Sequence, residues 1–296
     1  MTPAPDGAPP ALSADEARAL AQQHGLERLG GRPPFGVYVR RLWQRRSFLW
    51  TLSRAQASSK NADDRLGVLW HLLNPLFLVV SYFLIFGLLL ETRRGVDNFI
   101  AFLSIGVVVF GFSSSAITTG SKAIINNLNL VRALRFPRAM LPLGVVISEA
   151  LATLPAYGVL VIVMLATGEL PKVSWLLVPA AFLIQCVILS GLVLMGARLL
   201  NAARDVGNLI PVSIRLLRYV SGVFFSIEHY AGNHEVVATI LNLQPFALPI
   251  TMTRQAFLDE MHIDWAYWGI GCGWAVLLFS AGLWLFWRDE ANYGRA

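Results

Sequence analysis

The sequence predicts an all-α fold that crosses a membrane several times, and two observations carry that prediction. The first is composition: 55% of the 296 residues are hydrophobic and only 14% are charged, whereas globular domains carry about 25% charged residues. The second is a set of apolar stretches longer than the roughly 18 residues that indicate a membrane-spanning helix, in a chain whose mean hydropathy is +0.57. We therefore expect a polytopic membrane protein.

One transmembrane domain, residues 67–290, is expected to hold six spans. In chain order these are residues 68–90, 98–119, 141–167, 174–197, 207–226 and 265–287. The fifth segment is the weakest of the six, because it contains Arg215 and Arg218.

Two regions precede the first span. Residues 1–34 are rich in Pro and Ala and lack the basic and apolar parts of a signal peptide, so we expect a disordered cytoplasmic tail. Residues 35–66 are basic, with apolar side chains at helical spacing, which is typical of an amphipathic helix in the headgroup region. The residues that characterise this interface helix are Arg41, Trp43, Arg45 and Trp50. An ordinary helix packed on the protein is the alternative interpretation.

The orientation follows from the distribution of Lys and Arg. Of the 24 such residues, 18 fall before the first span, in loops 120–140 and 198–206, or at the C-terminus. Cytoplasmic loops carry this excess, so both termini are predicted to lie inside. The membrane topology explains the net positive charge of the chain, so this charge gives no reason to expect nucleic-acid binding. The last external loop, residues 227–264, should form two short helices broken near Pro245.

No motif for enzyme chemistry occurs in the sequence. It contains no phosphate-binding loop of the type G-x-x-x-x-G-K-[ST], no H-E-x-x-H, no G-x-S-x-G and no Cys/His metal spacing. We therefore expect no catalytic residue, metal or cofactor in this chain. A pore or carrier of this kind needs either an ion gradient or the ATPase of another subunit.

Four short patterns resemble a known family, the membrane subunits of type-2 ABC polysaccharide exporters. The first is an LG-x-LW-x-L-NP turn before the first span, and the second lies in the loop after the second span. The others are RDVGNLIP with GVFFSIE around the fifth segment and LNLQPFALPI before the last. The residues of the first two patterns are Leu66, Gly67, Leu69, Trp70, Leu73, Asn74, Pro75, Asn129, Val131, Phe136, Pro137, Leu141 and Pro142.

The resemblance implies a homodimer in the plasma (inner) membrane that pairs with two copies of an ABC nucleotide-binding subunit, which holds the ATP and Mg²⁺. The cargo it implies is a polysaccharide on a polyprenyl diphosphate lipid, such as O-antigen, teichoic acid or cell-wall galactan. It also implies that loop 120–139 couples to the ATPase and that the short helices of 227–264 form an external gate. The preference for Arg over Lys suggests an actinobacterial source and hence galactan. Small-molecule or drug efflux by the same fold is the alternative, and a gradient-driven carrier or an intramembrane enzyme is disfavoured.

Arg215 and Arg218 lie one helical turn apart in the fifth segment. Inserting one arginine at bilayer depth costs about 2.5–3.5 kcal/mol of free energy. One interpretation is that they line the conduit and bind the diphosphate of the cargo, because guanidinium groups match phosphate oxygens. A second is an intramembrane ion pair with Glu149, and a third is snorkelling of Arg218 to the interface.

Aromatic side chains in the first and fifth spans are candidates for a surface along which sugars slide, because rings offer apolar faces for stacking. Packing or lipid contact is the alternative for each of them. The candidate residues are Tyr82, Phe83, Phe86, Tyr219, Phe224 and Phe225.

The loop 120–139 mixes basic and apolar residues. Topology explains the charges, but an apolar patch in a cytoplasmic loop indicates a partner surface. The residues expected to contact the ATPase are Asn129, Leu130, Val131, Arg132, Arg135 and Phe136.

Overall fold

A computed structural model describes residues 33–59, 70–85, 96–134, 136–227, 235–291 and 293, with a few isolated positions before residue 33. The chain forms two units, residues 1–33 and residues 34–296. The predicted tail lies almost wholly outside the described residues, as do Phe86 and Arg135. Every secondary-structure element in the described part of the second unit is a helix, and this unit holds all the elements named below.

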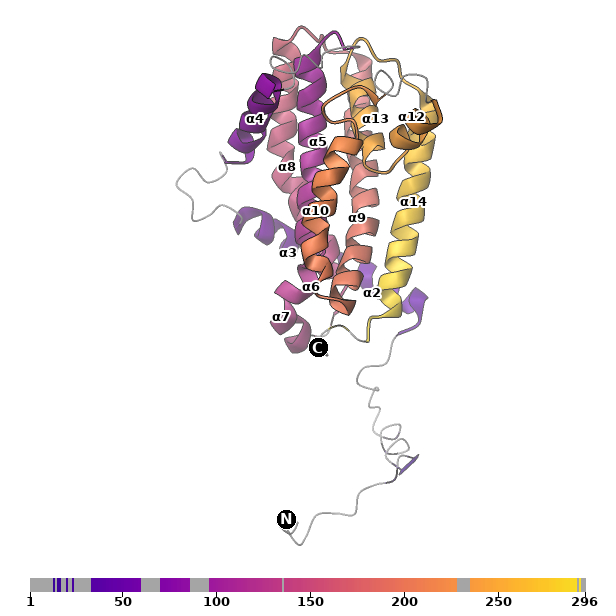
Figure 1. Cartoon of the computed structure of the whole chain (residues 1–296). Helices are drawn as coiled ribbons and strands as arrows, with labels where there is room; N and C mark the ends of the chain where they lie inside the picture. Colours follow the sequence, from indigo (N-terminus) through magenta and orange to yellow (C-terminus); the bar gives the residue numbers. More distant parts are fainter. Residues whose placement is uncertain are drawn as a thin grey trace. The chain divides into compact units, whose positions relative to one another are not determined.

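Four long helices form the bundle (Figure 1). They are α5 (Phe99–Gly120), α8 (Met140–Ala166), α9 (Val178–Ala202) and α14 (Trp265–Arg288), and each is long and apolar enough to cross a membrane. They correspond to the predicted spans 98–119, 141–167, 174–197 and 265–287. The chain is therefore an integral membrane protein.

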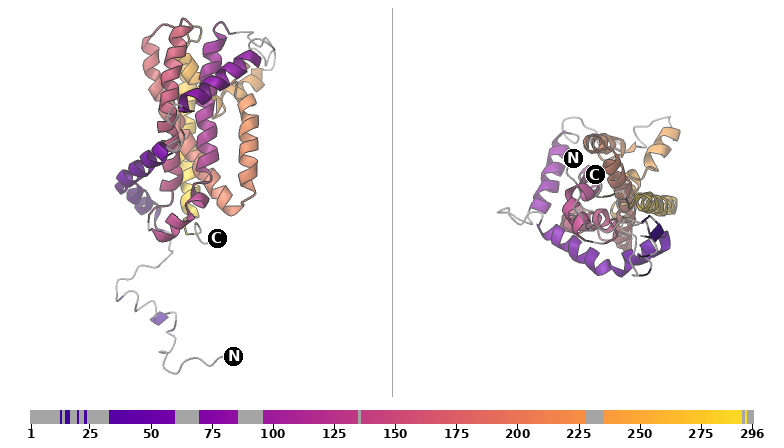
Figure 2. Two further views of the ribbon diagram at one scale, coloured as in Figure 1. Left: turned by 90° about the vertical axis from the view of Figure 1, so that its left-hand side faces the viewer. Right: turned by 90° about the horizontal axis from the view of Figure 1, so that it is seen from below.

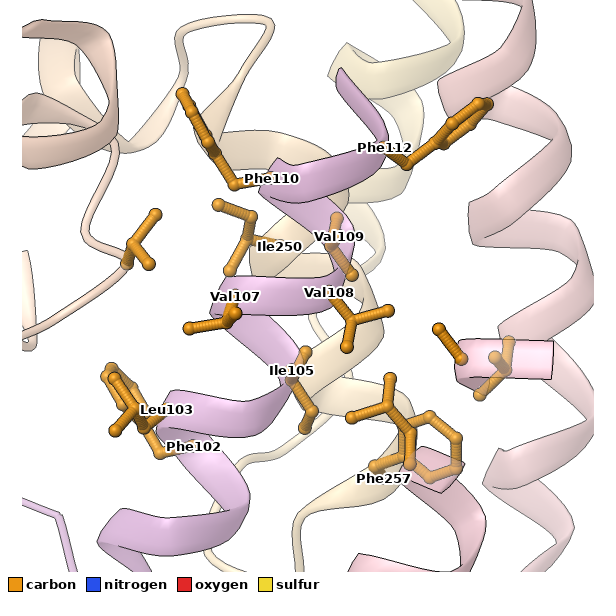
Figure 3. Packing of buried hydrophobic residues seen from close by; sticks show 14 of the residues in the cluster. Phe102, Leu103, Ile105, Val107, Val108, Val109, Phe110, Phe112, Ile250 and Phe257 are labelled. Atoms are coloured by element: carbon orange, nitrogen blue, oxygen red, sulfur yellow. The ribbon is translucent and has the colours of Figure 1, made fainter. Parts of the chain in front are cut away.

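Helix α5 occupies the centre of the bundle, and most of its residues are buried. Its side chains pack against those of α13 (Ala247–Phe257), as Figure 3 shows for Phe102, Ile105, Ile250 and Phe257. Helices α9 and α14 approach closely at Gly191 and Gly282, where a Cβ atom on either residue would overlap the facing backbone. Small residues at such a crossing let membrane helices pack backbone to backbone.

One end of the bundle is basic and the other is acidic. The basic end carries the short helices α6 (Ala123–Asn126) and α7 (Leu128–Ala133), together with Lys122, Arg132, Arg138, Arg198 and Arg288. The acidic end carries Asp97, Glu169, Asp259, Glu260 and Asp264. Helices α2 (Phe35–Gln44) and α3 (Arg46–Ser59) lie across the basic end, where α3 packs on α8 and α2 on α14 (Figure 2).

The remaining helices are shorter. Helix α4 (Trp70–Tyr82) packs on α5 and α8, and the short 3₁₀ helix η3 (Val173–Leu177) leads into α9. Helix α12 (Glu235–Asn242) meets α13 at 85°, and Pro245 lies in the break between them.

The fifth predicted span, residues 207–226, is a 15-residue helix, α10 (Val206–Val220), followed by an irregular segment. The helix ends where Ser221 and Gly222 follow it, and Gly222 has a φ of +66°, a left-handed conformation that favours glycine. The first predicted span, residues 68–90, is described only over residues 70–85. Four described helices pass the length and hydropathy test, or five if the bent pair α12–α13 is one span, so the count of six stays a prediction.

Candidate functional site

Arg218 connects three helices. Its Nη1 donates a 2.9 Å hydrogen bond to the hydroxyl of Tyr82 on α4, and its guanidinium carbon lies 5.5 Å from the ring centre of Phe110 on α5. The side chain is half-buried and oriented by both contacts. A cation over an aromatic ring is worth about 0.5–2 kcal/mol, depending on its desolvation. These contacts offset part of the cost of placing an arginine among apolar helices.

Two further aromatic rings continue from Tyr82, one after the other. Phe224 lies 4.7 Å from Tyr82, edge to face, and 5.4 Å from Tyr219. Phe224 is 1% exposed, whereas Tyr219 is 55% exposed. The structure thus brings together Tyr82, Arg218, Tyr219 and Phe224, which we call the ring cluster. Four of the residues predicted for the conduit are its members.

Arg215 lies one turn before Arg218 on α10 and is exposed, with its Nε 3.4 Å from the carbonyl oxygen of Pro211. Leu216 and Tyr219 are exposed on the same helix. Phe83 and Phe225 pack against the main hydrophobic core, to which Tyr82 and Phe224 of the ring cluster also belong. These two predicted conduit residues therefore share that core with members of the ring cluster.

Glu149 lies on α8, apart from the two arginines. It is buried, its Oε2 accepts a 2.7 Å hydrogen bond from Ser115 on α5, and it lines a cavity of about 230 Å³ with Trp70 and Asn74 of α4. Among the described residues, no ion pair joins Glu149 to Arg215 or Arg218. Within the described ranges, Arg218 bonds to Tyr82 and Glu149 to Ser115, in place of the ion pair that the sequence suggested.

Helix α7 and the residues after it carry the predicted coupling positions. Val131 is buried, while Leu130 and Phe136 are half-buried in the core of the basic end, where the Phe136 ring lies 5.7 Å from Phe48 on α3. Asn129, Arg132, Ala133 and Leu134 are exposed, and we call Asn129, Arg132 and Leu134 the α7 tip. Leu134, 51% exposed, is an apolar side chain that the α7 tip presents at its surface, whereas the sequence pattern favoured Leu130 and Phe136.

The predicted interface region consists of two helices, α2 and α3, which meet at Arg45. Trp43 and Trp50 are exposed, as is Arg41. The guanidinium of Arg46 lies 5.3 Å from the ring centre of Trp43. An apolar ring beside exposed guanidinium groups is the surface that a headgroup layer accommodates.

Sequence reasoning missed a buried polar junction at the basic end. The hydroxyl of Tyr38 on α2 donates a 2.9 Å hydrogen bond to Oε2 of Glu290, and the backbone N–H of Arg138 donates one of 2.9 Å to Oε1. The N–H of Ala139 donates to the hydroxyl of Tyr38 at 3.2 Å. Burial raises the pKa of Glu290 and the pKa of Tyr38. The junction joins α2, the end of the loop after α7 and the C-terminal segment.

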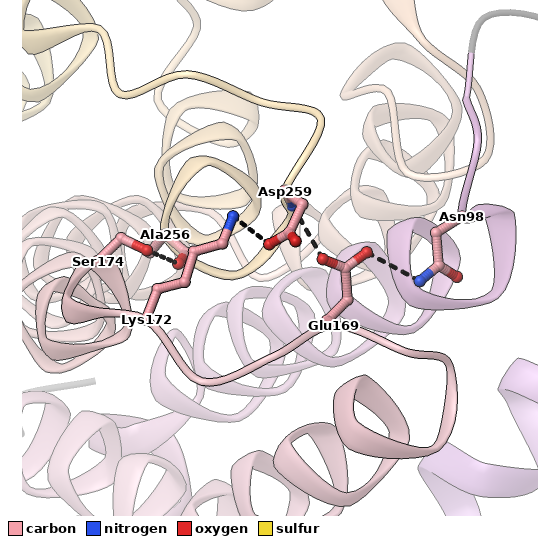
Figure 4. Close-up of polar contacts among 6 residues, drawn as sticks. All are labelled: Asn98, Glu169, Lys172, Ser174, Ala256 and Asp259. Atoms are coloured by element: carbon pink, nitrogen blue, oxygen red, sulfur yellow. Dashed lines mark hydrogen bonds and ion pairs between the residues drawn. The ribbon is translucent and has the colours of Figure 1, made fainter.

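A second polar cluster connects loops at the acidic end (Figure 4). Oε1 of Glu169 accepts a 2.9 Å hydrogen bond from Asn98, and its Oε2 accepts one of 2.9 Å from the N–H of Asp259. Lys172 forms an ion pair with Asp259. Within the ranges that the structure describes, no three His, Cys, Asp or Glu side chains could hold a metal ion. The cluster therefore fastens the loops before α5, after α8 and after α13.

Arg254 on α13 is the other residue whose role the sequence did not reveal. It is 5% exposed and donates to backbone carbonyl oxygens of α5 and of the segment after α10. From the sequence it was one of the few basic residues of an external loop. A single arginine in such a loop gives no signal of the carbonyl groups that it meets in the fold.

Comparison with known proteins identifies the family. The model of the ABC-2 type transporter family matches residues 47–258, well over half of the chain. An O-antigen export system permease protein RfbA of Klebsiella pneumoniae is 25% identical over 225 residues, which cover 76% of this chain and 85% of the relative. The permease of the same name from Myxococcus xanthus is 25% identical over 222 residues, 75% and 84% of the two chains. The chain therefore belongs to the ABC-2 type transporter family.

Proposed function

We propose that this chain is the transmembrane subunit of an ATP-driven exporter that moves polysaccharide linked to polyprenyl diphosphate across the plasma membrane. The similarity to O-antigen export permeases along three quarters of the chain supports the substrate class. Within this substrate class, O-antigen, teichoic acid and galactan are all compatible with the site. We favour galactan because the chain prefers Arg over Lys, which suggests an actinobacterial source. ATP and Mg²⁺ are held by a separate subunit in this proposal.

The ring cluster is the observation that carries the proposal. Arg218 on α10 binds the hydroxyl of Tyr82 on α4, and Phe224 connects the ring of Tyr82 with that of Tyr219. Aromatic faces stack against the C–H faces of sugars, and a guanidinium binds phosphate oxygens through paired donors. Arg215, exposed on the same helix, supplies a second cation toward the path. A diphosphate-linked glycan needs both kinds of contact.

A second copy of the chain is expected to complete the path. Helix α10 contacts α5 and α9 on one side, while Leu209, Leu216 and Tyr219 on the rest of its surface are exposed. An exposed arginine on such a surface needs water or protein next to it rather than lipid. In the proposed homodimer, two α10 helices face one another across the conduit.

The α7 tip is the proposed contact for the ATPase. It lies at the basic end, which the distribution of Lys and Arg assigns to the cytoplasm. Leu134 is apolar and exposed, and Arg132 and Asn129 surround it with polar groups. An apolar side chain within a polar rim is typical of a protein interface. In this orientation the ring cluster and helices α12 and α13 belong to the outer half of the membrane.

Depletion of the chain in its native cells tests the proposal. We expect lipid-linked glycan to accumulate on the cytoplasmic side, and expression of the intact chain to restore its export. A chain with Arg218→Met should reach the membrane in normal amount and restore export poorly. Unchanged surface glycan after depletion, with no intracellular lipid-linked glycan, would show that the cargo belongs to another class.

A further inference from the structure

The segment directly after α10, residues 221–225, has an irregular backbone that is largely buried. It begins at Ser221, takes a left-handed turn at Gly222 and continues through Val223, which is 0% exposed, to Phe224 and Phe225. A helix that ends inside a protein leaves its last carbonyl oxygens without partners. Buried carbonyl groups of this kind must find donors elsewhere.

Arg254 supplies these donors. Its Nη1 donates to the carbonyl oxygen of Gly222 at 2.9 Å, and its Nη2 donates to that of Val223 at 3.2 Å. The amide of Gln244 donates to the carbonyl oxygen of Val220 at 3.0 Å. Two of these three carbonyl groups therefore depend on one side chain.

The other side of the same guanidinium is fixed to α5. Nε and Nη2 donate to the carbonyl oxygen of Phe102 at 3.3 and 3.2 Å, and the guanidinium carbon lies 3.2 Å from the centre of the Phe102 ring. Arginine can do this because it presents five donors in a rigid plane, whereas lysine has one nitrogen. Arg254 thus joins α5, α13 and the irregular segment at a single point.

Gly106 on α5 makes room for this arrangement. A Cβ atom at this position would lie 2.8 Å from the carbonyl oxygen of Val223 and 2.9 Å from Nη2 of Arg254. Real Cβ contacts are essentially never this short, so any side chain at this position would displace the segment or the guanidinium. Gly111, on the same helix, has open space where its Cβ would be.

The segment also carries a member of the ring cluster. Phe224 follows directly after the two carbonyl groups bound by Arg254, and its ring contacts both Tyr82 and Tyr219. The place of the segment therefore determines whether these rings meet. Because Arg254 reaches the rings only through the segment, it is a positioning residue.

We propose that Arg254 holds the segment 221–225 closed over the outer part of the conduit, and that the conduit opens when the segment leaves Arg254. The idea of a conduit rests on the proposed function, but the bonds that hold the segment do not. The ligand of Arg254 is the backbone of this chain itself. On opening, the carbonyl oxygens of Gly222 and Val223 lose their hydrogen bonds from the guanidinium and accept hydrogen bonds from water or from hydroxyl groups of the cargo.

The test measures exposure of the segment to a thiol reagent, without any transport step. Val223→Cys is placed in the full-length chain, after Cys186 and Cys272 are replaced by Ala, and the purified protein in lipid nanodiscs is treated with a water-soluble maleimide. A second protein carries Val193→Cys, a buried position on α9 away from the segment. The rate of labelling reports how often each position opens.

With Arg254 present, we expect slow labelling at both positions. Arg254→Met keeps the volume and removes every donor, and since each lost hydrogen bond favours opening by about tenfold, labelling at position 223 should rise at least tenfold. Labelling at position 193 should stay unchanged, and Arg254→Lys should recover part of the protection at position 223. Equal rises at both positions, or none at position 223, would overturn the proposal.

Two glycine variants give a test that leaves Arg254 in place. Gly106→Ala should raise labelling at position 223, and Gly111→Ala on the same helix should not. If Gly106→Ala leaves position 223 protected, the segment is not held at this point. If instead the intact chain exports no glycan, the proposed function fails while the labelling results still decide whether Arg254 holds the segment.

Discussion

Arg218 on α10 donates a 2.9 Å hydrogen bond to the hydroxyl of Tyr82 on α4, which lies 136 positions earlier in the chain. The contact fixes one of the five donors of the guanidinium, and the ring of Phe110 lies beside its carbon atom. The arginine is therefore held in place without an acidic partner among the described residues. A guanidinium that is held by a neutral hydroxyl group keeps further donors with which it could bind an anion.

Arg218→Met should reduce export by about 10- to 100-fold, because it removes the proposed hydrogen bond from the guanidinium to the cargo. A hydrogen bond to a charged group contributes about 1.5–3 kcal/mol. Tyr82→Phe is the matched control: it removes the hydrogen bond and keeps the ring against Phe224. We expect it to lower the stability by about 1 kcal/mol and to leave most of the export. Glycan export in the depleted cells and thermal unfolding in detergent measure the two effects. Equal loss of export in both variants would assign the effect to the hydrogen bond and contradict a role for the charge.

Leu134→Glu should release the ATPase subunit without unfolding the chain, because Leu134 is exposed at the α7 tip. Ser58→Glu, on the exposed surface of α3 at the same end, serves as the control. Co-purification of the two subunits measures the result. Phe136→Glu is expected to unfold the basic end instead, because Phe136 packs on Phe48. If the Leu134→Glu complex stays intact and active, the α7 tip is not the contact.

Glu169→Ala should destabilise the protein more than Lys172→Ala. Glu169 is 6% exposed and accepts hydrogen bonds from Asn98 and from the N–H of Asp259, so its loss leaves a buried cavity and takes an acceptor from two partly buried donors, at up to about 1–3 kcal/mol each. The ion pair of Lys172 with Asp259 is largely exposed, and such pairs contribute about 0–1 kcal/mol. Thermal unfolding of the two variants in one detergent tests the order, and the reverse order would contradict these roles within the cluster.

Stability should rise as the pH falls below neutral, in part because of Glu290. Burial raises its pKa in the folded chain above the ordinary value of 4.5, so the folded chain binds a proton that the unfolded chain releases. By linkage, stability then increases as the pH falls through the raised pKa and is fully gained below 4.5. Glu290→Gln keeps an oxygen that accepts from Tyr38 and removes the charge, so it should flatten this slope. An unchanged slope of the unfolding temperature between neutral pH and the ordinary carboxyl pKa would show that Glu290 does not contribute.

The sequence predicted the parts of the fold that depend on apolar length. The four helices of the bundle follow from runs of 22 or more residues with few charges. The distribution of Lys and Arg along the chain predicts that one end of the bundle is basic. The end of α10 was harder to predict, because Ser221 and Gly222 stop a helix whose apolar pattern continues through Phe225. The carbonyl groups of this irregular segment accept hydrogen bonds from Arg254, about 30 positions later in the chain, and no local pattern reveals that contact.

The polar contacts of the site could not be predicted, because they join residues far apart in the chain. Tyr38 and Glu290 are separated by 252 positions and Arg254 and Phe102 by 152. The sequence made Arg218 and Tyr82 candidates for one conduit, but a hydrogen bond between them depends on how α4 and α10 pack. The same limit applies to Glu149, whose bond with Ser115 is set by the contact of α8 with α5.

Reconstitution tests the central claim most directly. The chain and its ATPase partner are placed in lipid vesicles with a polyprenyl-diphosphate glycan, and a lectin outside the vesicles reports the sugar that has crossed. We predict that ATP makes the glycan accessible to the lectin, and that Arg218→Met slows this by about 10- to 100-fold. ATP-dependent movement of a small amphipathic drug, with the glycan remaining on its original side, would contradict the claim.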